Sequence, residues 1–236
     1  MSLKAVLFDL DGTLLPMDMD TFVNAYFGLL VKKLAPLGYN GEKLIASIWS
    51  GTKAMVLNNG KKTNEEVFWD YFCSVFGKEA INDQPVFDEY YRNDFNKVKE
   101  VCRYNEKANV TVKILKEKGL RLVLATNPIF PKIATQNRAK WAGLDINDFE
   151  FYTTYENSYF CKPNLEYYKY ILDKLNLNAE ECLMVGNDVS EDLIAENLGM
   201  KVFLLDDCIL NKENKDVSAY NKGNFDELLK YIDTIQ

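Results

Sequence analysis

The sequence predicts an α/β fold in which a doubly wound parallel sheet carries an inserted all-helical domain. Residues 3–8 form an apolar run that ends abruptly in Asp9-Leu10-Asp11-Gly12-Thr13. After residue 120, similar runs alternate with helical patterns, whereas residues 17–101 show helical patterns and no convincing strand. Nearly continuous apolar strands that alternate with helices are typical of a parallel sheet covered on both faces.

The elements of the core follow in chain order. Strands are expected at residues 3–8, 121–125, 151–153, 181–185 and 201–205. Helices are expected at residues 108–118, 131–142, 165–175 and 190–198, with a closing helix at 224–235. Gly119, Gly143 and Gly199 follow three of these helices, as is common at helix C-termini.

The inserted part is expected to be entirely helical. Its four helices are expected at residues 18–37, 41–57, 64–76 and 84–101, separated by Pro, Gly and Asn signals. We therefore predict two domains: an α/β core formed by residues 1–16 and 102–236, and a helical domain formed by residues 17–101.

The composition restricts the chemistry. The 236 residues include no histidine, which excludes Ser-His-Asp and Cys-His nucleophile systems and His-ligated zinc sites. With 35 acidic and 28 basic residues, the chain lacks the basic patch that nucleic acids and anionic membranes require. Its five cysteines form no C-x-x-C pair, and neither a secretory leader nor a membrane-spanning stretch is recognised. We expect a cytoplasmic protein with a small-molecule partner, and neither a nucleic acid nor a membrane as partner.

Residues suited to a binding or catalytic site stand where the expected strands end or the next helix begins. They are Asp9, Asp11, Gly12, Thr126, Asn127, Lys162, Asp188 and Asp192. Because ligands of parallel sheets bind beyond the carboxyl ends of the strands, we expect these residues to converge. Four neighbouring carboxylates repel one another in a partly dry cleft, and an oxygen-preferring cation such as Mg²⁺ relieves that repulsion. Lys162 and the Thr126 hydroxyl then remain to bind an anion, and phosphate is the best match.

Each of these residues also has an ordinary structural interpretation when it is taken alone. Paired aspartates are common turn formers, Asp188 and Asp192 suit the start of a helix, and an isolated loop lysine is usually solvated. The functional hypothesis therefore depends on their joint occurrence at successive strand ends.

Four motifs, taken in order, resemble the signature motifs of the haloacid dehalogenase (HAD) superfamily. They are Asp9-Leu10-Asp11-Gly12-Thr13-Leu14, Thr126 at a strand end, Lys162-Pro163, and Gly186-Asn187-Asp188-Val189-Ser190-Glu191-Asp192. The resemblance implies a Rossmann-like HAD core and a C1-type cap formed by the helical domain. It also implies the phosphatase-like branch, because phosphatases need Asp11 and the metal-binding acids, whereas dehalogenases need neither.

The resemblance implies a role for each motif residue. Asp9 is implied as the nucleophile, and Asp11 as the acid that protonates the leaving oxygen and later activates water. Lys162 is implied as a catalytic residue that neutralises charge on the nucleophile and on the phosphate. The phosphate-binding residues that it implies are Gly12, Thr126, Asn127 and Lys162.

The same resemblance implies a magnesium site. Its ligands are Asp9, the backbone carbonyl of Asp11 and Asp188, with Asp192 binding directly or through water. The sequence departs from the commoner family form at Asn187, where an Asp often stands. That departure leaves open whether Asp188 or Asp192 is the direct ligand.

The implied function is a Mg²⁺-dependent phosphatase that hydrolyses a small phosphorylated metabolite through an aspartyl-phosphate. Two alternatives share the core residues: a phosphomutase or phosphotransferase acting on a sugar phosphate, and a catalytically inactive HAD-like binding protein. Sugar phosphates, phosphoglycolate-like acids and nucleoside monophosphates all remain open as substrates. Lys53 and Arg92 are candidates to contact a polar or anionic leaving group, although solvated positions suit both better. The expected assembly is a monomer or a small homo-oligomer.

Overall fold

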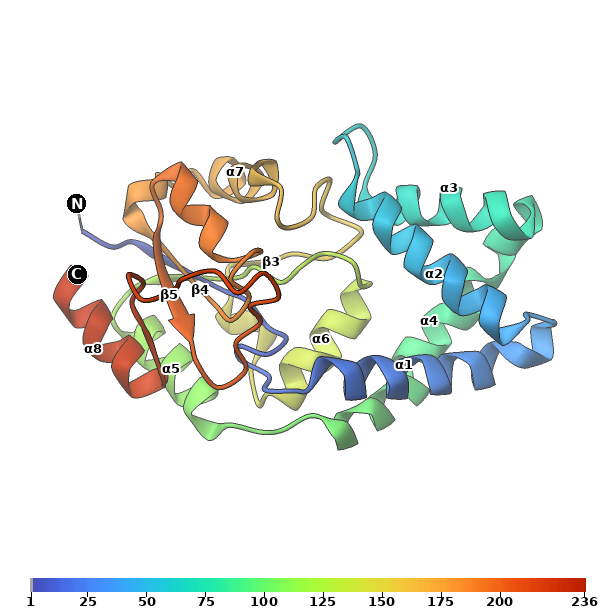
Figure 1. Cartoon of the computed structure of the whole chain (residues 1–236), viewed down its shortest axis with the longest axis horizontal. Coiled ribbons are helices and arrows are strands. Elements are labelled where there is room, and N and C mark those ends of the chain that lie inside the picture. Colours follow the sequence, from blue (N-terminus) through green and yellow to red (C-terminus); the bar gives the residue numbers. More distant parts are fainter. Residues whose placement is uncertain (1) are drawn as a thin grey trace.

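A parallel sheet forms the centre of the core, and a group of helices lies beside it, as the computed structural model of residues 2–236 shows (Figure 1). Within these residues the sheet has six strands in the order β3-β2-β1-β4-β5-β6, and all neighbouring strands are parallel. The strands are β1 (Ala5–Phe8), β2 (Arg121–Leu124), β3 (Phe151–Tyr152), β4 (Cys182–Gly186), β5 (Lys201–Leu205) and β6 (Lys222–Gly223). The predicted α/β class and its doubly wound parallel sheet are confirmed.

Helices cover both faces of this sheet. On one face lie α5 (Glu106–Glu117), α6 (Lys132–Trp141) and α8 (Phe225–Ile235), and on the other α7 (Leu165–Leu175) and a 3₁₀ helix (Leu193–Leu198). Successive residues of β1 point to opposite faces of the sheet. Val6 and Phe8 pack in the hydrophobic core beneath α5, α6 and α8, and Ala5 and Leu7 pack in the core beneath α7. All four side chains are fully buried, which explains why this strand is a continuous apolar run.

The register of the sheet fixes the position of the site. Phe8 lies opposite Leu124 on one side and Val185 on the other, so the three central strands end at the same edge. The chain leaves β1 toward β2 on one side and later returns to β4 on the other side. Ligands of open α/β sheets bind at such a switch point, which places the residues after Phe8 at the centre of the site.

The helical insertion between β1 and β2 contains α1 (Met19–Leu34), α2 (Gly41–Val56), α3 (Asn64–Phe76), α4 (Gln84–Arg92) and a 3₁₀ helix (Asp94–Val101). Where the chain enters and leaves it, Met17 pairs with Cys102, and the Arg103 N–H donates to the Pro16 carbonyl at 2.8 Å. The domain limits 1–16, 17–101 and 102–236 stay a prediction. The backbone contacts of Met17 with Cys102 and of Arg103 with Pro16 lie at these limits.

Two expected helices are wrong in type or length. Residues 84–101 do not form one helix, because the chain turns at Asn93 and continues as a 3₁₀ helix. Residues 190–198 form no α-helix, and only Leu193–Leu198 is helical, as a 3₁₀ helix. The carboxylate of Asp188 accepts the backbone N–H groups of Ser190 and Glu191, and this local turn replaces the first helical turn.

Within residues 2–236, none of the helices combines the length and the hydrophobicity that crossing a bilayer requires.

Candidate active site

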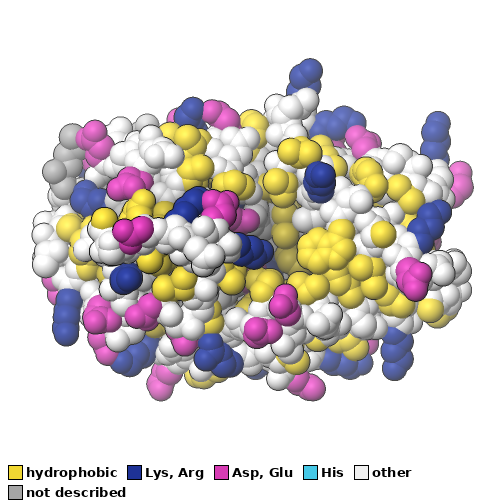
Figure 2. All heavy atoms as spheres, viewed as in Figure 1, with side chains coloured by type: hydrophobic (Ala, Val, Ile, Leu, Met, Phe, Trp, Pro, Cys, Tyr) yellow, Lys and Arg dark blue, Asp and Glu magenta, His cyan; other side chains and the backbone are white. Residues whose placement is uncertain are grey.

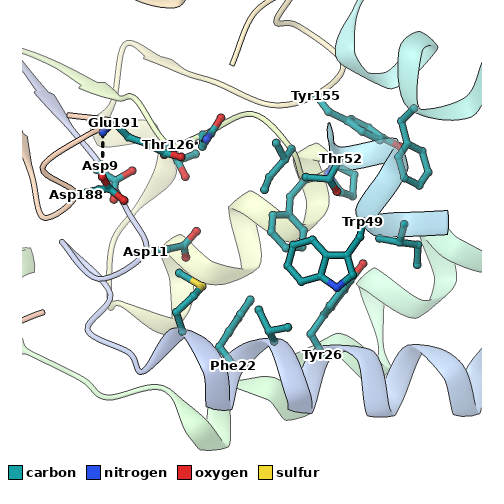
Figure 3. A pocket seen from close by; sticks show the side chains of 18 of the residues that line it. Asp9, Asp11, Phe22, Tyr26, Trp49, Thr52, Thr126, Tyr155, Asp188 and Glu191 are labelled. Atoms are coloured by element: carbon teal, nitrogen blue, oxygen red, sulfur yellow. Dashed lines mark hydrogen bonds between the residues drawn. The ribbon is translucent and has the colours of Figure 1, made fainter. Parts of the chain in front are cut away.

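A cavity of about 290 Å³ opens at the carboxyl edge of the sheet, between the core and the helical insertion. In Figure 2, hydrophobic side chains gather on the insertion beside the hollow that separates the two parts. Six of the predicted site residues line the cavity: Asp9, Asp11, Thr126, Asn127, Asp188 and Asp192. Figure 3 shows Asp9, Asp11 and Asp188 on one side of it, facing aromatic side chains on the other.

Lys162 lies fully buried beneath the cavity, between two carboxylates. Its Nζ is 2.9 Å from Asp9 Oδ1 and 2.6 Å from Asp192 Oδ1. Burial alone lowers the pKa of a lysine, but the Asp192 and Asp9 carboxylates outweigh that effect and hold the pKa of Lys162 well above its usual value. The ammonium therefore stays charged and keeps the buried Asp9 carboxylate in one orientation.

The other oxygen of Asp9 is held from the turn that follows β1. The Thr13 hydroxyl lies 3.1 Å from Asp9 Oδ2 and 2.9 Å from Asn187 Oδ1, and Asn187 Nδ2 donates to the Cys208 carbonyl at 2.7 Å. Gly12 has φ +86°, and a Cβ on it would lie 2.9 Å from Asn187 Cγ. The positive φ and the close approach of Asn187 together require glycine here.

Both oxygens of Asp192 are already engaged. Oδ1 pairs with Lys162, and Oδ2 accepts the backbone N–H groups of Asn187 at 3.0 Å and Asp188 at 2.9 Å. A Cβ on Gly186 would lie 2.6 Å from Asp192 Cβ, so glycine at the end of β4 makes room for this carboxylate. Asp192 thus shapes the loop after β4.

Asp188 is engaged on one side only. Its Oδ1 accepts the N–H groups of Ser190 at 2.8 Å and Glu191 at 2.9 Å, while Oδ2 has no hydrogen-bond partner within residues 2–236. In the same part of the chain, no hydrogen bond reaches the backbone carbonyl of Asp11. These two free oxygen acceptors, together with Asp9, form a donor set of the hard type that Mg²⁺ prefers.

The donor set is a small one. Residues 2–236 contain no group of three or more His, Cys, Asp or Glu side chains arranged to hold a metal ion. Mg²⁺ usually binds one or two carboxylates and keeps several water or phosphate oxygens, so two carboxylates and a carbonyl fit it.

Arg138 holds Asp11 from beneath. This fully buried arginine of α6 donates from Nη1 to Asp11 Oδ2 and lies 4.3 Å from the Phe130 ring centroid. Asp11 Oδ1 is buried, and none of the described residues forms a hydrogen bond with it. Burial raises the pKa of Asp11, Arg138 opposes the rise, and the Asp9 carboxylate adds to it. One oxygen of Asp11 is therefore fixed while the other is free to carry a proton.

Arg138 is absent from the sequence-based prediction. It follows Ala134 by four residues and Thr135 by three, and all three side chains lie on the buried face of α6. The spacing of these three residues could have indicated that Arg138 lies on the buried face of the helix, although a buried arginine is rare.

Asn127 connects two other motifs. Its Nδ2 donates to Glu191 Oε2 at 3.0 Å, and its Oδ1 accepts the Lys162 N–H at 3.3 Å. Its own backbone N–H makes no hydrogen bond within residues 2–236, nor does the hydroxyl of Thr126, so both can donate to an anion in the cavity. Glu191, which the prediction also missed, lines the same cavity, and its pKa is raised to about 8, chiefly by burial.

Comparison with known proteins gives concordant results. A family model described as "Hydrolase: haloacid dehalogenase-like hydrolase" matches residues 3–197. The chain is 28% identical over 239 residues to glyceraldehyde 3-phosphate phosphatase of Methanocaldococcus jannaschii, covering 99% of both chains. It is 26% identical over 219 residues to pyrophosphatase PpaX of Halalkalibacterium halodurans, covering 85% of this chain and 82% of that one.

A solved structure shows the same fold. The HAD-hydrolase YfnB of Bacillus subtilis, crystallised with magnesium bound, matches with a TM-score of 0.55 and 18% identity, covering 98% of this chain and 99% of that one. The helical insertion between β1 and β2 corresponds to a C1-type cap. Because the family model spans most of the chain and its motifs meet at one sheet edge, this protein belongs to the haloacid dehalogenase-like hydrolases.

Proposed function

We propose that the protein is a Mg²⁺-dependent phosphatase that hydrolyses a small phosphorylated metabolite through an aspartyl-phosphate on Asp9. The arrangement of Asp9 and Asp11 carries this proposal. Asp9 is held by Lys162 and Thr13 in one orientation, and Asp11 has a free, buried oxygen beside the same cavity. The relatives named as phosphatases support the same branch of the family.

In the first step, the Asp9 carboxylate attacks phosphorus, and the bond from phosphorus to the leaving oxygen breaks. That oxygen takes the electron pair and a proton from Asp11, whose pKa is raised by burial. Lys162, the Thr126 hydroxyl and the Asn127 N–H offset the negative charge on the transferring group. The products are an alcohol and phospho-Asp9.

In the second step, water attacks phosphorus and releases the Asp9 carboxylate together with inorganic phosphate. Asp11, now ionised, takes a proton from that water and returns to its starting state. The cap lies over the cavity and limits the access of bulk water to the reactive acyl phosphate.

The proposed magnesium ligands are Asp9, the Asp11 carbonyl and Asp188. When bound, Mg²⁺ would reduce the charge repulsion between the phosphate and the surrounding carboxylates. We place Asp192 outside the ligand shell, because its two oxygens bind Lys162 and two backbone N–H groups. Asp9 differs, because its Oδ2 faces only the Thr13 hydroxyl, which can donate to Asn187 Oδ1 instead. A cytoplasmic location and a monomer or small homo-oligomer remain predictions.

Phosphate release in the presence of Mg²⁺ tests the proposal. The purified protein, incubated with p-nitrophenyl phosphate and a panel of phosphorylated metabolites, should release inorganic phosphate. EDTA should reduce the rate by at least about a hundredfold, and excess Mg²⁺ should restore it. Transfer of the phosphoryl group to a sugar without free phosphate would support the phosphomutase alternative. An absence of both products would support the inactive binding protein.

Replacement of Arg138 is expected to impair proton donation by Asp11. In the Arg138→Met variant the pKa of Asp11 should rise further, so the carboxyl keeps its proton, but nothing then fixes its orientation. The proton is no longer directed at the leaving oxygen, so alcohol leaving groups should depart more slowly. General acid catalysis contributes a factor of about 10²–10⁴, so we expect at least a tenfold loss of kcat for ethyl phosphate. p-Nitrophenyl phosphate should lose much less, because p-nitrophenolate leaves without protonation. The measurement is the ratio of the two rates.

The conservative Arg138→Lys variant serves as the control, because it keeps the charge and loses only the planar fork. Its ratio of rates should lie between those of the native and Arg138→Met proteins. A merely structural role for Arg138 would lower both rates equally, and equal losses would contradict the proposed positioning of Asp11.

A further inference from the structure

The wall of the cavity opposite the carboxylates is aromatic and comes mainly from the cap, so we call it the cap wall. Figure 3 shows Phe22 and Tyr26 of α1, Trp49 of α2 and Tyr155 of the core across the cavity from Asp9 and Asp11. The cavity is continuous from these carboxylates to the rings, so a phosphate bound at Asp9 would direct its alcohol part toward them.

This wall carries no formal charge among the described residues that line the cavity. The acidic side chains all come from the core, and the single basic one, Lys212, also comes from the core. Lys212 follows Leu210, whose backbone pairs with Asp188, so it belongs to the phosphate end. Lys53 and Arg92, considered from the sequence as contacts for an anionic leaving group, are exposed and do not line the cavity.

The hydroxyl groups in the wall are also neutral and partly engaged. The hydroxyls of Tyr26 and Tyr91 lie 2.9 Å apart and bind each other. Burial raises the pKa of Tyr26 to about 12 and that of Tyr91 well above its usual value, so neither carries charge near neutral pH. A carboxylate or a second phosphate buried against this wall would lose its hydration and find no cation.

Trp49 offers an apolar surface that is already in position. Its side chain is 50% exposed, yet its ring packs at 5.5 Å from the ring of Phe27. Covering the free face of such a ring with another apolar group removes apolar surface from water and is therefore favourable.

Building on the phosphatase activity proposed above, we propose that the cap selects phosphate monoesters whose alcohol part is uncharged and carries an apolar ring. The ring packs on Trp49 and the neighbouring aromatic side chains while the phosphate binds at Asp9. Substrates with a second anionic group, such as 2-phosphoglycolate and pyrophosphate, are disfavoured. The specificity therefore differs from that named for the relative PpaX.

A set of small phosphates tests this proposal on the native enzyme with Mg²⁺. 2-Phenylethyl phosphate and ethyl phosphate have closely similar leaving oxygens and differ in the ring. Burial of a phenyl ring should raise kcat/KM for the former at least about tenfold over the latter. Both 2-phosphoglycolate and pyrophosphate should be at least tenfold poorer than 2-phenylethyl phosphate.

Two variants locate the preference in the cap wall. Trp49→Ala should reduce the ratio between the phenylethyl and ethyl esters at least about threefold, because the ring loses its packing surface. Leu57→Ala is the matched control, since Leu57 directly follows the same helix, is 71% exposed and does not line the cavity. Thr52→Arg, which introduces a cation at the wall, should shift the preference toward 2-phosphoglycolate.

The outcomes separate the two proposals. Faster hydrolysis of 2-phosphoglycolate or pyrophosphate than of 2-phenylethyl phosphate would overturn the substrate class and leave the phosphatase function intact. An unchanged ester ratio in Trp49→Ala would do the same. Phosphate release from p-nitrophenyl phosphate or the metabolite panel, but from none of these four compounds, would overturn the substrate class alone. If no compound of either set releases phosphate, the phosphatase function fails and the substrate class fails with it.

Discussion

The Asp9→Asn variant is expected to lose phosphatase activity by at least about 10³-fold, because an amide cannot replace the carboxylate as nucleophile. The substitution keeps the shape of the side chain and leaves an oxygen for Lys162 or Thr13. Lys162 retains its 2.6 Å contact with Asp192, so the ammonium is not left unpaired. The variant should therefore fold with a Tm close to that of the native enzyme, and the loss should appear in kcat.

Two measurements check this result. Steady-state phosphate release gives the size of the loss, and mass spectrometry of acid-quenched reactions should detect a phosphoryl adduct on the native enzyme and none on Asp9→Asn. Asp173→Asn, at an exposed position of α7, is the matched control and should retain full activity. A folded Asp9→Asn protein that kept a tenth or more of the native rate would show that another group attacks phosphorus.

The sheet was predictable because local pattern and tertiary environment agree. β1 has four consecutive apolar residues and all four are fully buried, as a central parallel strand requires. β6 was missed, because Lys222 and Gly223 carry no strand pattern and are paired only through the edge of β5. Pairing with β5, rather than the local sequence, determines that Lys222 and Gly223 form a strand.

Convergence of the motifs was also predictable, since parallel strands in register bring their carboxyl ends together. The structure places Asp9, Thr126 and Asp188 around one cavity for this reason. Arg138 and Glu191 could not be assigned in the same way. Their roles depend on which face of α6 is buried and on how the loop after β4 folds, and neither is encoded in residue type.

The choice between Asp188 and Asp192 shows the same limit of sequence reasoning. Both carboxylates follow β4, and their spacing suits either role. Hydrogen bonds distinguish them: among residues 2–236 nothing binds Asp188 Oδ2, whereas Lys162 and two backbone N–H groups bind the oxygens of Asp192. The difference arises from tertiary contacts between the loop and a lysine thirty residues earlier in the chain.

Substitution of the two aspartates is therefore expected to have different consequences. Asp188→Asn removes one negative ligand but keeps an oxygen for the Ser190 and Glu191 N–H groups. The variant should fold normally, while its Mg²⁺ requirement should rise at least about tenfold, within the range measured when metal sites lose a supporting group. Asp192→Asn must turn its NH2 group either toward Lys162 or toward the Asn187 and Asp188 N–H groups, and none of these can accept a hydrogen bond. Unlike Asp9→Asn, whose NH2 group can face the Thr13 hydroxyl, it should lower the free energy of unfolding by about 2–4 kcal/mol.

Thermal unfolding with and without Mg²⁺ distinguishes the two effects independently of activity. A ligand that binds only the folded state raises Tm with concentration, so native protein and Asp192→Asn should both be stabilised by Mg²⁺, although Asp192→Asn starts from a lower Tm. In EDTA the Tm of Asp192→Asn should be about 4–16 °C below the Tm of the native protein, for a chain of this size. Asp188→Asn should match the native Tm in EDTA and respond weakly to Mg²⁺. The opposite pattern is that Asp192→Asn abolishes the rise of Tm with Mg²⁺ and Asp188→Asn preserves it. That result would make Asp192 the direct ligand, and the ion pair between Lys162 and Asp192 would then have to open when the metal binds.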